Sequence, residues 1–238
     1  MAVKVRDVIR RERGQLLAYA CLSGIVLGLT TIAYSIDVLV FRRLLGETPI
    51  VAGFLICIVG LVLLTVLLSG GWFWFYRRGN LKGLLYSSGL AAVFGLVAIL
   101  ADYVLRFYPA DINVWFPESL LFYPAMGFYA EIIFQVLPLT LVLIILSRPS
   151  RGRDGWRNVW IAILVASLFE PAFQVLPLVS AQFPLWFAFF EFVRIFLIIV
   201  SQLSFFRRYD FVTMYWFRIV YYLFWHISWG YLRVGLLF

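Results

Sequence analysis

Charged residues are scarce in this chain: only 13% of its 238 residues are Asp, Glu, Lys or Arg, whereas 64% are hydrophobic. A soluble domain is about a quarter charged and about half apolar. The mean hydropathy of +0.96 points in the same direction. The composition therefore excludes an ordinary soluble domain and predicts an integral membrane protein.

Residue types that hold metals and cofactors are also scarce. The chain has one histidine and two cysteines, with neither a CxxC pair nor an HExxH motif, so we predict no metal site. Cys21 and Cys57 fall in apolar runs, where cysteine is usually a small buried apolar residue. The only lysines, Lys4 and Lys82, lie outside these runs, which excludes a retinal-type Schiff base. We therefore expect no cofactor.

Long apolar runs, in contrast, are abundant. A helix needs about 20 mostly apolar residues to cross a hydrocarbon core of about 30 Å. The sequence predicts an all-α bundle of about seven membrane-spanning helices, which fills residues 1–238 as one domain after a basic N-terminal segment, 1–14. The first apolar run is too long for the core of a cleavable signal peptide, so we expect it to remain as an anchor. The predicted spans are residues 15–41, 48–70, 83–105, 119–146, 158–181, 185–206 and 211–236.

Basic residues are distributed unequally between alternate loops. Fourteen of the twenty fall on the side of the N-terminus and four on the opposite side, while Arg194 and Arg218 lie inside spans. The positive-inside rule then predicts a cytoplasmic N-terminus. Anionic lipids at that surface explain the net charge of +8, so we expect the lipid bilayer as a partner and no nucleic acid. Short loops favour the cytoplasmic membrane of a prokaryote.

Small residues recur every four positions in the third predicted span. Gly83, Ser87, Ala91 and Gly95 form a stripe along one helix face. Such stripes let the backbones of neighbouring membrane helices approach closely. We predict a helix-packing face here.

Prolines interrupt the fourth and fifth predicted spans. Pro124 and Pro138 lie in the fourth span, and Pro171 and Pro177 in the fifth. Proline removes a backbone hydrogen bond and kinks a helix. Kinked membrane helices often border a cavity, because freed carbonyls need partners.

Ionisable side chains inside the spans are the strongest functional signal. An acidic residue at the centre of a membrane helix costs roughly 2.5–3.5 kcal/mol, and such residues usually face a cavity or the bundle interior. We predict that these side chains share one cavity and pair with each other. Asp37 and Asp102 are expected nearer the membrane surface, close to water. The residues inside the spans are Glu131, Glu170, Glu191, Arg194, Arg218 and His226.

Three short segments resemble the motifs of a known family. Ala130–Gln135 resembles the EExxxR motif of the CAAX-protease and bacteriocin-processing family, Ser167–Phe173 its FxxxH motif, and His226–Gly230 its HxxxN motif. Active members, as the resemblance implies, are multi-helix glutamate-dependent intramembrane endopeptidases that need no metal. In them, a glutamate and a histidine activate water, while a histidine and an asparagine stabilise the oxyanion. This chemistry requires a base within reach of the water and donors near the developing charge.

The chain departs from these motifs at positions that handle protons. Ala130 stands at the water-activating glutamate, Gln135 at the arginine, Phe173 at the histidine and Gly230 at the asparagine. Of the family's residues, Glu131, Phe169 and His226 remain. The extra Glu170 is a second possible base, so Glu131, Glu170 and His226 are the candidate catalytic residues. Gln135, Glu191, Arg194 and Arg218 are then the candidate binding residues.

Three functional hypotheses follow from these residues. The first is a non-catalytic relative whose membrane cavity binds a lipid, a prenyl chain or a partner membrane helix, and the sequence favours it. The second is a diverged intramembrane endopeptidase that cleaves a prenylated or transmembrane peptide. The third is a proton-coupled transporter, although no inverted repeat is visible between the halves of the chain.

Overall fold

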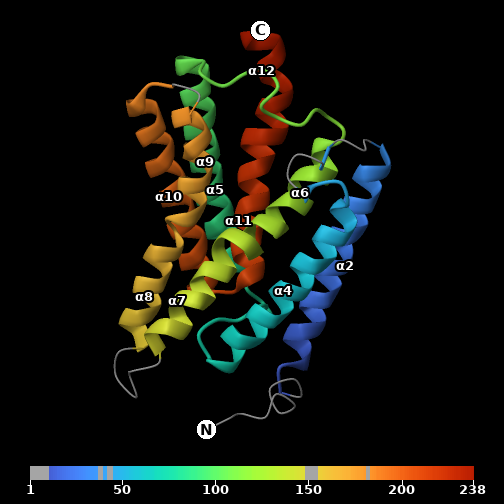
Figure 1. Cartoon of the computed structure of the whole chain (residues 1–238), viewed down its shortest axis with the longest axis vertical. Coiled ribbons are helices and arrows are strands. Elements are labelled where there is room, and N and C mark those ends of the chain that lie inside the picture. The colour runs from blue at the N-terminus through green and yellow to red at the C-terminus, as the bar shows by residue number, and fades with distance from the viewer. Residues whose placement is uncertain (1–10, 37–39, 42–44, 148–154, 181–182) are drawn as a thin grey trace.

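The computed structural model describes residues 11–36, 40–41, 45–147, 155–180 and 183–238 (Figure 1). Within these ranges the chain forms helices and loops and no strand, which confirms the predicted all-α class. Asp37 and most of the N-terminal segment 1–14 lie outside the described residues. The helical elements are α2 (Arg13–Ile36), α4 (Pro49–Ser69), α5 (Leu81–Leu105), α6 (Ser119–Ala130), η1 (Glu131–Val136), α7 (Leu137–Ser147), α8 (Gly155–Ala166), α9 (Phe169–Ser180), α10 (Leu185–Arg208), α11 (Phe211–Tyr222), η2 (Leu223–Ser228) and α12 (Trp229–Leu237).

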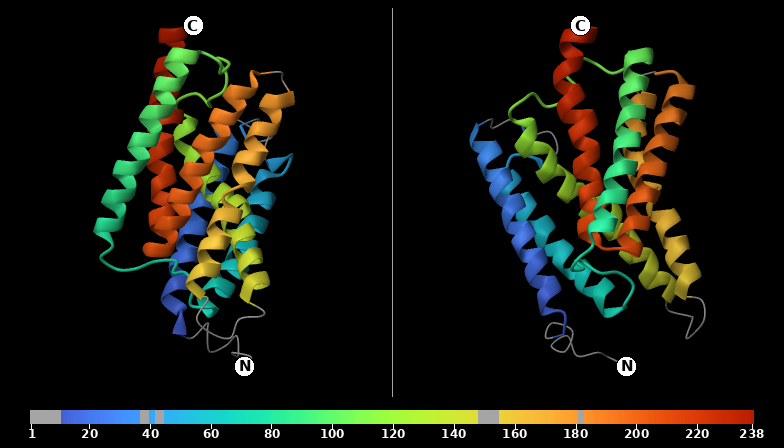
Figure 2. Two further views of the ribbon diagram at one scale, coloured as in Figure 1. Left: turned by 90° about the vertical axis from the view of Figure 1, so that its left-hand side faces the viewer. Right: turned by 180° about the vertical axis from the view of Figure 1, so that it is seen from behind.

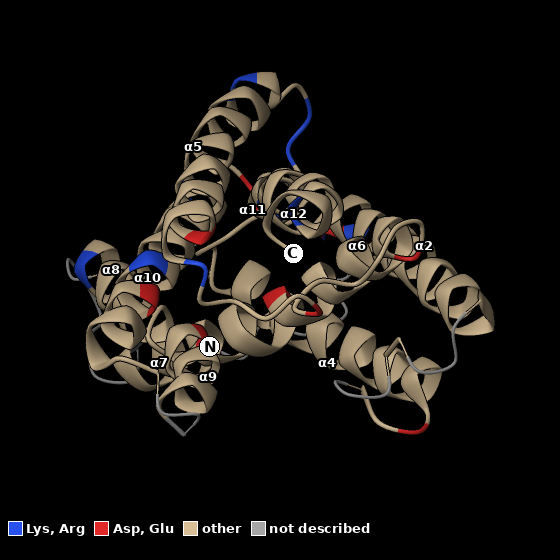
Figure 3. Ribbon diagram, turned by 90° about the horizontal axis from the view of Figure 1, so that it is seen from above, with Lys and Arg blue, Asp and Glu red and all other residues tan. Residues whose placement is uncertain are grey.

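Six helical stretches of the described chain are long and apolar enough to cross a membrane, and they match the first six predicted spans. The seventh predicted span, 211–236, forms one unbroken rod of α11, η2 and α12. Arg218, His226, Arg233 and several tyrosines make this rod less apolar. It packs against α5, α6 and α10 and lies near the middle of the bundle (Figure 3), where protein side chains can pair with its polar groups. Most of the ribbon carries no charged residue, as Figure 3 also shows.

The helices run between two ends of the molecule. In Figures 1 and 2, α2 begins at the lower end and α12 finishes at the upper end. The α4–α5 loop meets the start of α11 at the lower end, where Asp210 caps α11 by accepting a hydrogen bond of 2.8 Å from the Thr213 amide. The same carboxylate accepts from the Arg77 amide at 2.9 Å, which ties the two connections together.

The small-residue stripe of α5 is buried, which confirms the predicted packing face. Gly83, Ser87, Ala91 and Gly95 all belong to the buried face of the helix. A Cβ atom at Gly95 would lie 2.6 Å from the Cβ of Phe224 in η2, so only glycine fits this approach. Figure 2 shows α5 running beside α11 and α12.

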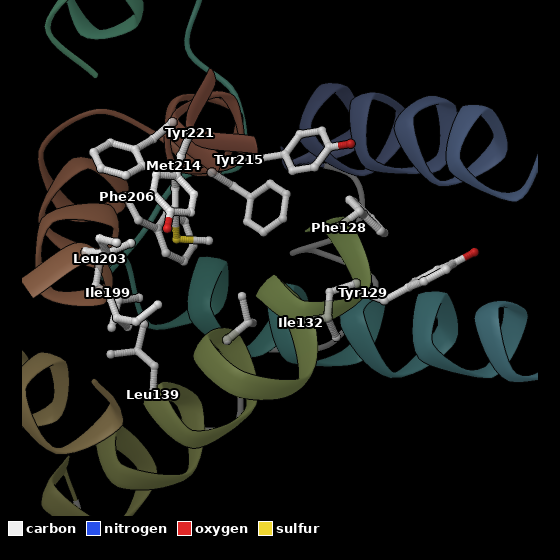
Figure 4. Close-up of a cluster of buried hydrophobic side chains, with 14 of the residues drawn as sticks. Phe128, Tyr129, Ile132, Leu139, Ile199, Leu203, Phe206, Met214, Tyr215 and Tyr221 are labelled. Carbon is white, nitrogen blue, oxygen red and sulfur yellow. The ribbon is translucent and has the colours of Figure 1, made fainter. Parts of the chain in front are cut away.

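A hydrophobic core joins the helices that carry the candidate site. Apolar side chains of α6, η1, α7, α10 and α11 meet there (Figure 4). Their packing fixes the rotation of each helix and therefore the direction of its polar side chains. The residues labelled in Figure 4 are Phe128, Tyr129, Ile132, Leu139, Ile199, Leu203, Phe206, Met214, Tyr215 and Tyr221.

Two helices are irregular where prolines predicted kinks. Before Pro138 the backbone opens into the π-helical turn η1, in which the Leu137 amide donates to the Ile132 carbonyl, five residues back. Before Pro171 the helix is broken at Ser167–Leu168, because a proline ring clashes with the carbonyl four residues earlier. The fifth span therefore consists of two helices, α8 and α9, which together remain long and apolar enough to cross a membrane.

A second π-helical turn, η2, lies within the continuous rod of α11, η2 and α12, and no proline is present there. The Trp229 amide donates to the Phe224 carbonyl, again five residues back. Glu131 begins η1, Glu170 lies in the first turn of α9 and His226 lies in η2. Two of the three candidate catalytic residues thus lie in π-helical turns, which are frequent at functional sites, and Glu170 follows directly after the break in the fifth span.

Candidate functional site

A cavity of about 210 Å³ lies between α9, α10, α11, η2 and the loop before α6. Isoleucines and aromatic rings form apolar parts of its wall, and two clusters of polar side chains border it. Its lining residues are Tyr108, Ile112, Glu170, Gln174, Glu191, Arg194, Ile195, Ile198, Ile199, Gln202, Phe217, Arg218, Tyr221, Tyr222, Trp225 and His226.

Arg218 joins the two candidate glutamates. Its Nε donates to Glu131 Oε1 at 2.6 Å, while Nη1 and Nη2 donate to Glu170 Oε1 and Oε2 at 2.9 and 2.7 Å. The forked contact with Glu170 is the two-point geometry that guanidinium and carboxylate groups favour. All three side chains are buried, with Arg218 and Glu170 only 5% and 4% exposed. This contact links α11 to η1 and to α9.

Two glutamines complete this group. Gln202 on α10 donates through Nε2 to Glu131 Oε1 at 2.6 Å. Gln135 donates through Nε2 to Gln202 Oε1 at 3.0 Å and lies one helical turn beyond Glu131. We call Glu131, Gln135, Glu170, Gln202 and Arg218 the Arg218 cluster.

The Arg218 cluster is incompletely paired. Two carboxylates face one guanidinium, so the fully ionised group carries a net charge of −1. Glu131 Oε2 and Gln135 Oε1 are buried and have no hydrogen-bond partner among the described residues. A buried polar atom without a partner costs about 1–3 kcal/mol, which makes this arrangement unusual for a purely structural group.

A second cluster, the Arg194 cluster, consists of Glu191, Arg194 and Tyr221. Arg194 holds Glu191 on the same helix through Nε at 3.1 Å and through a short contact between Nη2 and Glu191 Oε2. Its Nη1 donates to the hydroxyl of Tyr221 at 2.6 Å. This cluster is neutral, because one carboxylate matches one guanidinium.

Three tyrosine hydroxyls are placed to donate hydrogen bonds into the cavity. The Tyr221 and Tyr222 oxygens accept from Arg194 and Arg218, so their own protons remain available. The Tyr108 hydroxyl is buried and has no partner among the described residues. Burial raises the pKa of the Tyr108 phenol well above its ordinary value, so this group stays protonated. The cavity therefore offers donors to a hydrogen-bond acceptor.

His226 lines the same cavity. Its Nδ1 lies 2.7 Å from Asn113 Oδ1, and its ring stacks on Tyr123 with 4.5 Å between centroids. Asn113 Oδ1 is an acceptor, because it also accepts from the Tyr123 hydroxyl at 3.4 Å. His226 Nδ1 must therefore be the donor and carry the ring proton. The other ring nitrogen, Nε2, then carries a lone pair, and no hydrogen bond joins it to the described residues.

Asn113 occupies space that Gly230 leaves. A Cβ atom at Gly230 would lie 3.1 Å from Asn113 Cβ and 3.1 Å from Asn113 Nδ2. The Asn113 amide nitrogen is itself buried without a partner among the described residues. An asparagine side chain is thus paired with His226, although it comes from the loop before α6 and not from position 230.

The structure brings the predicted site residues together in two layers. Glu170, Glu191, Arg194, Arg218 and His226 line the cavity. Glu131 and Gln135 lie behind this lining, fully buried, and reach it through Arg218 and Gln202. Phe173 does not line the cavity, and its ring contacts that of Phe134 with 4.9 Å between centroids.

Several residues of the site were not predicted. Gln202 could have been predicted from the sequence, because a polar side chain inside an apolar helix is costly to place in a membrane, as the glutamates are. Asn113 and Tyr108 lie in a loop, where nothing in the sequence indicates that they turn toward the bundle. Tyr221 and Tyr222 carry no signal in a span that is rich in aromatic residues.

The geometry limits what the glutamates can do chemically. Both oxygens of Glu170 accept from Arg218, and Oε1 also accepts from Gln174 at 2.9 Å. Glu131 keeps an unpaired oxygen but does not line the cavity. A general base must reach the proton that it removes. In this arrangement neither carboxylate presents a free lone pair to a molecule in the cavity.

Among the described residues, no three His, Cys, Asp or Glu side chains are grouped so that they could hold a metal ion. No known protein family, curated protein or solved structure matches this chain.

Proposed function

We propose that this protein is a non-catalytic relative of the CAAX-protease and bacteriocin-processing family that binds the polar end of a membrane lipid or prenyl compound. In this proposal the chain crosses the cytoplasmic membrane of a prokaryote seven times, with its N-terminus in the cytoplasm. The observation that carries the proposal is the pairing of Arg218 with Glu131 and Glu170, beside a cavity that stays open. That pairing occupies the candidate bases and leaves the cavity lining available for binding.

The size of the cavity favours the end of a ligand. Its volume of about 210 Å³ is below the roughly 300–1,000 Å³ of sites that enclose a drug-sized molecule. A partner helix, about 10–12 Å across with its side chains, is too wide to enter. A carbonyl, ester or hydroxyl group with one adjoining apolar segment fits, while the rest of the chain continues into the bilayer.

The charges of the cavity favour a neutral acceptor. Arg194 and Arg218 already face carboxylates, so an anionic headgroup would compete with Glu191 and Glu170 for them. The hydroxyls of Tyr221 and Tyr222 donate without such competition, and the Tyr108 hydroxyl lies beside the Glu191 carboxylate. An uncharged oxygen therefore gains hydrogen bonds without breaking an ion pair.

Ligand binding is tested with a cavity-filling variant. Ile198 lines the cavity on α10, so Ile198→Trp should displace the ligand, whereas Val193→Trp adds the same ring to an exposed position of the same helix. We expect native mass spectrometry of the purified protein to show a bound lipid in the wild type and in Val193→Trp and none in Ile198→Trp. Equal lipid retention by all three proteins would contradict the proposal.

The diverged endopeptidase remains the second candidate because of one specific observation. His226 and the Asn113 amide form a pair at the cavity wall, which resembles the family's last motif with the asparagine supplied by a loop. In this alternative, Glu170 would have to leave Arg218 before it could activate water. Incubation with prenylated and transmembrane peptides tests it: cleavage by the wild type that disappears in Glu170→Gln would replace the binding proposal.

A further inference from the structure

The unpaired atoms of the Arg218 cluster belong to two side chains on one face of η1. Glu131 and Gln135 are four residues apart, and both contact Gln202. One carries the unpaired Oε2 and the other the unpaired Oε1, and both atoms are acceptors. Each needs a donor, and no described residue provides one.

Turning the amide groups over does not remove this need. If Glu131 is ionised, Gln202 must direct its Nε2 donor toward Glu131. Gln202 Oε1 then faces Gln135 and must accept from Gln135 Nε2, so Gln135 Oε1 has no donor. Reversing both amides would place the Gln202 carbonyl against Glu131, which then requires a proton on Glu131. In either orientation of the two amides, one more donor hydrogen is needed to complete the hydrogen bonds of the cluster.

The surrounding charges do not supply the missing positive charge. The elements packed against η1 are α4, α6, α7 and α9, and Glu170 on α9 is the only charged residue among their described parts. Arg218 approaches from α11, and α10 contributes the neutral Gln202, since Arg194 is held by Glu191. The titratable side chains of α4 and α6 are Cys57, Tyr123 and Tyr129, and Tyr215 and Tyr222 of α11 interact with Glu131. All five are neutral.

Glu170 is the better-paired carboxylate of the two. Its oxygens accept from both terminal nitrogens of Arg218, from Gln174, and from Gln135 at 3.5 Å. Hydrogen bonds of this kind favour the ionised form. Glu131 has one satisfied oxygen and one unsatisfied oxygen, and it is 0% exposed. The geometry therefore separates one ionised carboxylate from one that can hold a proton.

We propose that Glu131 carries a proton on Oε2 and donates it to the carbonyl oxygen of Gln135, which makes the Arg218 cluster a neutral proton-binding site inside the membrane. The proton satisfies both unpaired atoms and balances the charge of Arg218, Glu170 and Glu131 in one step. Two carboxylates that share one compensating charge commonly retain a single proton. The proton is held behind the cavity lining, because Glu131 does not line the cavity, whereas Glu170, Gln202 and Arg218 of the same cluster do.

Infrared spectroscopy of the full chain in lipid nanodiscs tests the proposal. We expect the wild type at neutral pH to show the carbonyl stretch of a protonated, buried carboxylic acid. The band should vanish in Glu131→Gln, whose amide reproduces the neutral donor, and persist in Glu118→Gln, a control carboxyl in the loop before α6. It should also vanish in Glu170→Gln, because Arg218 then balances an ionised Glu131 alone. A wild type without this band, or a band that persists in Glu131→Gln, would overturn the proposal.

Thermal unfolding provides a second measurement that does not depend on the band. Glu131→Gln should fold with a midpoint equal to or above that of the wild type, because the substituted amide can accept from Arg218 and donate to Gln135. Glu170→Gln should lower the midpoint, because it removes the forked ionic contact. If Glu131 is instead ionised and its Oε2 is hydrated, Glu131→Gln should lower the midpoint as much as Glu170→Gln does. That result would reject the proton site, and so would a failure of Glu131→Gln to fold.

Discussion

Two buried arginines in this bundle are paired in different ways. Arg233 on α12 is 0% exposed and faces one carboxylate, Asp102, which it contacts through Nε at 2.8 Å and Nη2 at 3.1 Å. Asp102 also accepts from Trp229 Nε1 at 2.7 Å, and the carbonyls of Tyr108, Pro109 and Ala110 accept the remaining arginine donors. This group is neutral, and none of its side-chain polar atoms lacks a partner.

Arg218 is equally buried but faces two carboxylates, and its cluster retains two atoms without partners. Arg218 lines the cavity, whereas neither Arg233 nor Asp102 does. The difference shows that burial of charge in a membrane helix does not by itself mark a site. Incomplete pairing next to a cavity distinguishes the Arg218 cluster from the Asp102–Arg233 pair. That pair holds together α5, α12 and the loop between α5 and α6.

The largest effect should come from Arg218→Leu. It leaves Glu170 buried without its cation and removes the Nε donor from Glu131, and loss of one partner of a buried ion pair costs about 3–5 kcal/mol. We expect the upper end of that range for the loss in free energy of unfolding, measured by reversible denaturation in mixed micelles. A loss below about 1 kcal/mol would show that the cluster does not depend on its ion pairs.

Arg233→Leu should cost less, about 3 kcal/mol, because only Asp102 loses its partner. The exposed Pro109 carbonyl can then bind water. The double variant Asp102→Leu/Arg233→Leu should recover most of the loss, since apolar replacement of a complete buried pair is often neutral. The matched double variant Glu170→Leu/Arg218→Leu should recover less, because the Gln135 and Gln202 side chains remain buried. Equal recovery in the two double variants would remove the distinction between the clusters.

A smaller effect is expected when one glutamine is removed from the Arg218 cluster. Gln202→Leu takes a donor from Glu131 and an acceptor from Gln135, so we expect a loss of about 1–3 kcal/mol in the free energy of unfolding. Gln174→Leu is the control, since Gln174 also bonds a cluster glutamate but is exposed. Its loss should stay below about 1 kcal/mol. A control loss as large as that of Gln202→Leu would mean that burial does not set the cost.

The sequence predicted most of the fold because hydropathy and small-residue spacing are local signals. The positions of six spans and the buried stripe of α5 could be read directly. The break before Pro171 was expected as a kink only, since proline does not specify whether the chain continues as one helix. The π-helical turn at His226 could not be predicted, because η2 contains no proline.

The pairing within the site was less predictable. The cost of burying charge identified Glu131, Glu170 and Arg218, but not which carboxylate meets which arginine, since that depends on helix rotation. The same limit applies to Asp102, which lies in the last turn of α5, where the sequence placed it near the end of its span, but whose burial against Arg233 could not be predicted. Asn113 reaches His226 from a loop, and only the folded chain brings the two together.

The smallest effect on stability should come from Tyr108→Phe, and it separates binding from structure most clearly. The Tyr108 hydroxyl has no partner among the described residues, so its removal should change the free energy of unfolding by less than about 1 kcal/mol or should stabilise the protein. If that hydroxyl donates to a ligand oxygen, lipid affinity should fall about tenfold, equivalent to about 1.4 kcal/mol. Tyr103→Phe on the exposed face of α5 is the matched control and should change neither quantity. Titration of a labelled lipid against the three proteins in nanodiscs measures the affinity. Unchanged affinity in Tyr108→Phe would mean that its hydroxyl does not contact the ligand, and binding would have to depend on Tyr221 and Tyr222, whose oxygens already accept from arginines.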